Sequence, residues 1–109
     1  MDDRAVVVLD KDGIVRFWSG GAEKILRRQS HEAIGRSVDF IIPEYFRDQH
    51  WAAFRRAMTA GVLHEARDRF VVPVQVSQEE VMPLVASLAL ITDAAGHPCG
   101  AVAVFVEQE

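Results

Sequence analysis

The order of the predicted elements indicates an α+β fold, in which a five-stranded antiparallel sheet carries short helices and one long helix on one face. Two apolar runs rich in valine flank an Asp12-Gly13 turn near the start of the chain, which is typical of a β-hairpin. Pro43 and Gly61 bound a stretch with the apolar spacing of a helix, and three strand-like runs follow it. We expect strands at 5–9, 14–18, 63–74, 81–92 and 100–106, short helices at 22–28 and 31–34, and the long helix at 44–60.

Turn and cap residues separate these elements. Ser30 is the expected N-cap of the second short helix, and Gly35 ends that helix. A polar segment at 77–80 separates the first two of the last three strands, and the turn residues at 93–98 separate the last two. The sequence shows no repeat or interdomain linker, so we expect one domain over residues 1–109.

Composition and charge exclude several classes of function. The chain is 50% hydrophobic and 26% charged, which is typical of a folded globular domain. Its 12 basic and 16 acidic residues give a net charge of −4, whereas nucleic-acid binding needs clustered basic residues. The single cysteine, Cys99, cannot form an internal disulfide, and no apolar run is long enough for a signal peptide or a membrane span. We therefore expect a soluble, cytoplasmic domain that binds neither nucleic acid nor membrane.

His50 is the most informative residue of the long helix. It shares a helical stripe with Phe46, Phe54 and Ala57, so its imidazole should point toward the apolar interior. An unpartnered buried polar group costs about 1–3 kcal/mol, and a partner is therefore expected. A backbone carbonyl and an iron atom are the two alternatives.

The layout is similar to that of the PAS domain along nearly the whole chain. Residues 12–18 resemble the first hairpin of PAS sensors, residues 22–25 and 32–37 resemble their short-helix region, and residues 93–100 resemble their last hairpin turn. The asparagine that usually follows the first hairpin is Ser19 here. The resemblance implies a PAS fold and a sensory function.

Within this family, the long helix is most similar to that of haem-binding oxygen sensors. Pro43, Glu44, Arg47 and His50 fit their Pro-Glu-x-x-Arg-x-x-His pattern, in which the histidine is the proximal iron ligand. The resemblance also implies an arginine and a histidine near the haem propionates, and this chain has Arg56 and His64 at those offsets. A neutral imidazole is a good iron ligand, and a guanidinium pairs well with a propionate. The implied cofactor is haem b, and the implied signal is a diatomic gas (O2, CO or NO) or a change of redox state.

The chain departs from that pattern where the family places an arginine that holds bound oxygen. An ungapped match puts Phe70 there, with Arg67 and Arg69 just before it in the chain, and Arg69 should face away from the pocket because strand residues alternate. Ala86 and Leu88 match the two distal apolar positions and leave a space that suits CO or NO at least as well as O2. Met82 is a candidate sixth iron ligand, because some haem PAS sensors use a methionine in that role.

Other interpretations stay open. The same pattern occurs in PAS domains without haem, which leaves a pocket for a small organic ligand or a ligand-free dimerisation module as alternatives. Trp51 and Phe54 are candidate cofactor contacts, although residues at the helical spacing of Trp51, Phe54 and Met58 more often belong to a core. In a ligand-free module these three residues and Leu88 would fill the pocket. Flavin-binding photosensor relatives need a cysteine in the short-helix region, where this chain has none. No set of residues typical of a catalytic triad, metal cluster or phosphate loop is found, so no enzymatic activity is expected.

The last strands are apolar on both alternating sets of side chains. A strand exposed to water on one face should alternate with polar residues, so this pattern predicts cover on both faces. One face would line the pocket, and the other would pack on a second copy, another domain or a flanking helix. We expect a homodimer, or docking to an output domain, through the outer face of the sheet.

Overall fold

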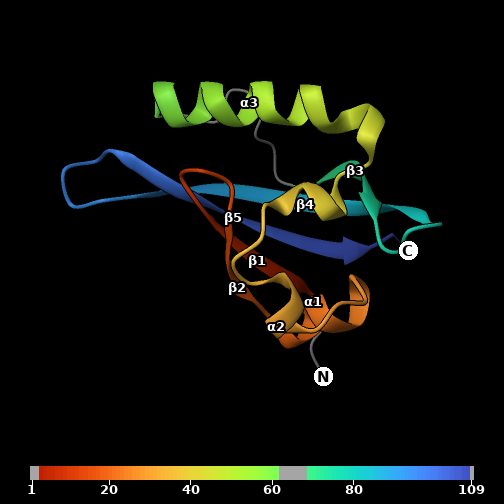
Figure 1. Cartoon of the computed structure of the whole chain (residues 1–109). Helices are drawn as coiled ribbons and strands as arrows, with labels where there is room; N and C mark the ends of the chain where they lie inside the picture. Colours follow the sequence, from red (N-terminus) through yellow and green to blue (C-terminus); the bar gives the residue numbers. More distant parts are fainter. Residues whose placement is uncertain (1–2, 62–68, 109) are drawn as a thin grey trace.

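The fold is a five-stranded antiparallel sheet with all helices on one face, as expected. The computed structural model describes residues 3–61 and 69–108. The strand order in the sheet is β2-β1-β5-β4-β3, and Figure 1 shows α3 running along the sheet with α1 and α2 grouped near the N-terminal strands. The elements are, in chain order, β1 (Ala5–Asp10), β2 (Val15–Trp18), α1 (Gly20–Ile25), α2 (Ser30–Ala33), the 3-10 turns η1 (Val38–Ile41) and η2 (Glu44–Phe46), α3 (Arg47–Ala60), β3 (Phe70–Gln75), β4 (Val81–Thr92) and β5 (Pro98–Glu107).

The register of the strands decides which side chains face the helices. β1 pairs with β5 from Ala5 opposite Phe105 to Asp10 opposite Gly100, and β4 pairs with β5 along most of its length. Because side chains alternate across a strand, every second residue of each strand points toward the helices and the remainder form the outer face. Val7 and Leu9 on β1 and Leu84 and Ala86 on β4 are buried on the inner side.

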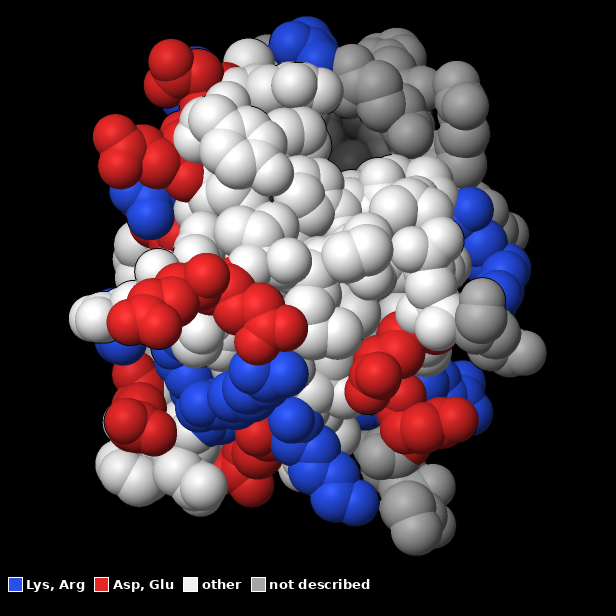
Figure 2. Space-filling model, turned by 90° about the vertical axis from the view of Figure 1, so that its right-hand side faces the viewer, with Lys and Arg blue, Asp and Glu red and all other residues white. Residues whose placement is uncertain are grey.

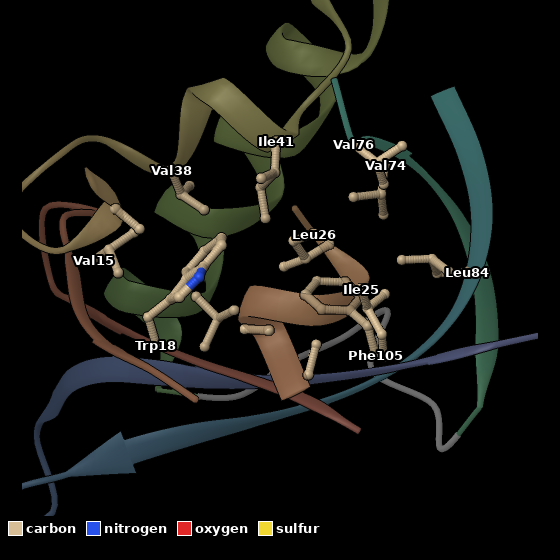
Figure 3. Packing of buried hydrophobic residues seen from close by; sticks show 14 of the residues in the cluster. Val15, Trp18, Ile25, Leu26, Val38, Ile41, Val74, Val76, Leu84 and Phe105 are labelled. Atoms are coloured by element: carbon tan, nitrogen blue, oxygen red, sulfur yellow. The ribbon is translucent and has the colours of Figure 1, made fainter. Parts of the chain in front are cut away.

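The hydrophobic core lies between the short helices and one end of the sheet. Trp18 is only 3% exposed, and its indole nitrogen donates a hydrogen bond to the Arg28 carbonyl at 2.8 Å. Its ring lies 5.5 Å from that of Phe40. Figure 3 shows the labelled side chains pointing toward one another in this cluster: Val15, Trp18, Ile25, Leu26, Val38, Ile41, Val74, Val76, Leu84 and Phe105.

The described elements differ from the predicted ones mainly at their ends. The long helix was expected from residue 44, but 44–46 form the 3-10 turn η2 and α3 starts at Arg47. The N-cap of α2 is Gln29 rather than Ser30, because Gln29 and Glu32 form a reciprocal capping box. α1 begins at Gly20 and ends at Ile25, so the expected helix at 22–28 was placed too late in the chain. The first part of the strand expected at 63–74 falls largely outside the described residues, and β3 is seen from Phe70.

No helix among the described residues is long and apolar enough to cross a membrane.

Candidate ligand-binding site

An apolar cavity of about 310 Å³ lies between α3 and the inner face of the sheet. Its walls come from α3, from the segment around η1, and from the inner residues of β1, β3, β4 and β5. The polar side chains on its wall are Gln49, His50 and Arg56, all on α3. A hollow with mainly apolar walls and a few polar groups on one side is the usual form of a small-ligand site.

His50 is a half-buried polar residue on the wall of this cavity. Phe46, Phe54 and Ala57 line the cavity beside it, so the predicted helical stripe is confirmed. The imidazole packs edge-to-face on Trp51 with ring centroids 4.7 Å apart and stacks on Phe54 at 6.1 Å. Its Nδ1 atom is buried and has no hydrogen-bond partner among the described residues, so of the two alternatives the backbone carbonyl is not found at this atom.

Burial also determines the charge of this histidine. Removal from water disfavours the imidazolium and lowers the pKa of His50 from 6.5 to about 4, although the Asp39 carboxylate acts in the opposite direction. The ring is therefore neutral at pH 7, which is the form that binds a metal.

Most of the other predicted site residues meet at the same cavity. Phe54, Arg56, Phe70, Ala86 and Leu88 all line it. Arg56 is an exposed residue of α3 that also contributes to the cavity wall, as a group at the mouth of the pocket should. His64 and Arg67 lie outside the described residues.

Trp51 and Met82 are placed elsewhere. Trp51 follows His50 on α3 but does not line the cavity, and its indole nitrogen donates to Oδ1 of Asp39 at 2.6 Å. Met82 is inward-facing, but its sulfur lies 3.8 Å from the Arg27 guanidinium, away from the cavity wall. Arg69 is exposed just before β3, consistent with its expected orientation away from the pocket.

Sequence reasoning missed the contribution of η1. Val38, Ile41 and Ile42 close one end of the cavity. Their i, i+3, i+4 spacing is the signal that would have predicted an apolar helical turn, but the turn is too short to stand out from the loop around it.

The cavity is not filled by the side chains that a ligand-free module would use. Phe54, Met58 and Leu88 form part of its wall and leave the space between them open, while Trp51 points to another part of the fold. The structure therefore favours a binding site over a closed core.

Charge is distributed without a broad basic area on the side of the molecule shown in Figure 2. Acidic and basic side chains are interspersed there around an uncharged centre.

Comparison with known families identifies the fold. The PAS fold family matches residues 3–106. The chain belongs to the PAS family. This PAS domain has the expected order of strands and helices, and the resemblance seen in its hairpin and short-helix residues is confirmed at the level of the family.

Solved structures agree with this fold. The PAS domain of a protein from Colwellia psychrerythraea superposes with a TM-score of 0.83 at 15% identity, covering 98% of this chain and 87% of that one. A light-oxygen-voltage domain studied with a flavin analogue has a TM-score of 0.74 at 15% identity, covering 97% of this chain and 78% of that one. A PAS-B domain of Drosophila melanogaster Cycle with bound glycerol has a TM-score of 0.71 at 11% identity, covering 91% and 94%. At these identities the similarity shows the fold alone.

Proposed function

We propose that this PAS domain is a sensor that binds haem b in the cavity beneath α3, with His50 as the protein ligand to iron. The observation that carries the proposal is a buried imidazole nitrogen without a partner among the described residues, on a side chain that lines an apolar cavity. Such a group costs stability unless a bound molecule satisfies it.

The residues around His50 fit this cofactor in chemical type. The imidazole is neutral at pH 7 because burial lowers its pKa to about 4, so no proton competes with iron. Arg56 carries a guanidinium at the cavity wall, where it would pair with a propionate. Phe70, Ala86 and Leu88 supply an apolar environment for a porphyrin face. When bound, haem supplies an iron atom that takes a diatomic gas or changes its redox state.

The described walls favour a gas that needs no hydrogen-bond donor. Phe70 lines the cavity, and by the resemblance to haem-binding sensors it stands where they have an oxygen-holding arginine; the exposed Arg69 does not line the cavity. We therefore propose that the site suits CO or NO as a signal at least as well as O2.

A small organic ligand is the second candidate, and the cavity volume favours it. About 310 Å³ lies at the lower end of the range of about 300–1,000 Å³ for small-ligand pockets, and it is less than a porphyrin occupies. A small, mainly apolar organic molecule with one polar group would enter this space as it stands, and that group would hydrogen-bond to His50. Haem would require α3 to move away from the sheet.

A flavin sensor of the light-oxygen-voltage type is less well supported. Its photochemistry needs a cysteine in the short-helix region, and the single cysteine of this chain, Cys99, is exposed near the start of β5.

The deciding experiment is haem titration followed by absorption spectroscopy. We expect the wild-type protein to give a saturable Soret band that His50→Ala abolishes. His31→Ala is the matched control, because His31 is exposed on α2, and it should bind haem like the wild type. A wild-type protein without a Soret band, or a His50→Ala variant with an unchanged band, would contradict the haem proposal. Native mass spectrometry of the purified protein would then reveal a retained small organic ligand.

We also propose that the outer face of the sheet carries the signal to a partner. Its side chains are mostly apolar across all five strands, and no described element covers them. Phe17 and Val71 are 49% and 54% exposed on this face. We favour a second copy of the chain as the partner, since two faces with few charges can pack on each other without like-charge repulsion.

A further inference from the structure

Trp51 connects the cavity to a distant part of the fold. It follows His50 on α3, and because successive helical residues point about 100° apart, the two rings face different surroundings. The indole nitrogen donates to Oδ1 of Asp39 in η1 at 2.6 Å, and the indole ring meets the His50 ring edge-to-face at 4.7 Å with an interplanar angle of 77°. One aromatic side chain thus touches both the cavity residue and η1.

The same indole ring lies on Gly13, in the turn between β1 and β2. A Cβ atom at Gly13 would overlap the six-membered ring of Trp51, and Gly13 has φ of +80°, which favours glycine. The Gly13 amide donates to the Asp10 carbonyl at 3.0 Å, and its own carbonyl accepts from the Val38 amide at 3.0 Å. The hairpin turn, η1 and α3 therefore meet at the Trp51 ring.

We propose that Gly13 and Asp39 are positioning residues for the His50 imidazole, and that both act through Trp51. Gly13 provides the space that lets the six-membered ring of the indole reach the turn, and Asp39 fixes the direction of its N–H group. The indole ring then limits where the imidazole can lie. Displacement of Trp51 at either contact should move His50 at the cavity wall. The inference rests on the proposed function only in taking His50 as the group that anchors the ligand.

The test needs no ligand. The ring resonances of His50, assigned with His50→Gln, are compared by NMR in Gly13→Ala and Gly35→Ala. The two glycines share a positive φ, +80° and +93°, but a Cβ at Gly35 meets nothing within 4 Å. We expect Gly13→Ala to shift the His50 resonances and Gly35→Ala to leave them at the wild-type positions. Equal His50 shifts in the two folded variants would overturn the inference.

A second pair of variants guards against a failure of Gly13→Ala to fold. Asp39→Ala removes the acceptor for the Trp51 N–H group, whereas Asp39→Asn keeps an oxygen acceptor at that place. In a Trp18→Phe background, Trp51 is the remaining tryptophan of the two in the chain, so its fluorescence reports its environment alone. We expect Asp39→Ala to change this emission and the His50 resonances, and Asp39→Asn to restore the indole emission. An unchanged His50 signal in Asp39→Ala would contradict the proposal.

Haem titration separates the two proposals. If the wild type binds haem, we expect Gly13→Ala and Asp39→Ala to bind it about tenfold more weakly, as is typical of residues that orient a metal ligand, with Gly35→Ala unchanged. If the wild type binds no haem, the proposed function falls, while the ligand-free NMR comparison still decides whether Gly13 and Asp39 position His50.

Discussion

Two neighbouring side chains on α3 have different contacts. His50 lines the cavity, whereas Trp51 contacts η1 and the turn between β1 and β2. His50 could be placed from the sequence, because the stripe of Phe46, Phe54 and Ala57 fixes its direction, and all four residues line the cavity. Trp51 could not be placed in this way. Its direction depends on Asp39 and Gly13, which lie 12 and 38 residues earlier in the chain and contact it only after folding.

The half-buried His50 imidazole should make the stability of the fold depend on pH. Burial lowers its pKa from 6.5 to about 4, so the unfolded chain takes up this proton at a higher pH than the folded one. Stability is therefore complete above about pH 6.5 and is lost as the pH falls from 6.5 toward 4. We expect His50 to account for a loss of about 2–3 kcal/mol in the free energy of unfolding over this range, measured by urea denaturation.

Replacement of His50 isolates this contribution from that of other acid-sensitive groups. His50→Phe should show a shallower decline of stability between pH 6.5 and 4, while His31→Gln, altered at an exposed position, should follow the wild type. A His50→Phe variant whose stability declines as steeply as that of the wild type would show that the imidazole is not buried in its neutral form.

At the scale of elements, Ser19 joins the first strand to the first helix. Its hydroxyl oxygen accepts the Ala22 amide at 3.1 Å as the N-cap of α1 and the Val6 amide of β1 at 2.9 Å. We expect Ser19→Ala to lower the free energy of unfolding by about 1–2 kcal/mol, because two amide donors lose their acceptor. Ser77→Ala is the control: its hydroxyl accepts only an exposed amide in the β3–β4 turn, at 3.3 Å, and the loss should be within about 0.5 kcal/mol. Equal losses would contradict the assigned role of Ser19.

The elements themselves were largely predictable, and the errors have physical causes. Gly61 ends α3 in a left-handed conformation, as its position predicted. Pro43 precedes a 3-10 turn and not the helix itself. The Phe46 amide donates to the Pro43 carbonyl at 2.8 Å, three residues back, and α3 begins only at Arg47. The residue type of Ser30 predicts an N-cap, but the reciprocal bonds of Gln29 and Glu32 satisfy the helix start one residue earlier. Local propensity therefore predicts that a helix or strand is present more accurately than it predicts the residue at which the element begins.

At the scale of the molecule, the inner and outer faces of the sheet are linked by alternation along each strand. Ala101 and Ala103 of β5 line the cavity, while Val102 and Val104 point to the opposite face. A ligand that moved an inner residue would therefore also displace the adjacent residue of the same strand, whose side chain lies on the outer face. The sequence predicted this two-faced apolar pattern, but it did not show how large the cavity is, because the volume depends on how far α3 stands from the sheet.

The outer face should decide the oligomeric state of the domain. It combines apolar residues from all five strands, and its more exposed members are Phe17 on β2 and Val71 on β3. A charge introduced there would have to be desolvated in a dimer but would stay hydrated in a monomer, so it should weaken association without unfolding the domain.

We expect the wild type to form a dimer in size-exclusion chromatography with light scattering, and Phe17→Lys or Val71→Lys to shift it toward the monomer. Tyr45→Lys is the matched control, because Tyr45 is an apolar aromatic residue on η2, 76% exposed and away from the sheet. It should leave the dimer intact, and circular dichroism should show all three variants folded. A wild type that stays monomeric at high concentration would contradict self-association and leave the outer face to a partner of another kind. A dimer lost in Tyr45→Lys but kept in Phe17→Lys and Val71→Lys would place the interface on the helical side instead.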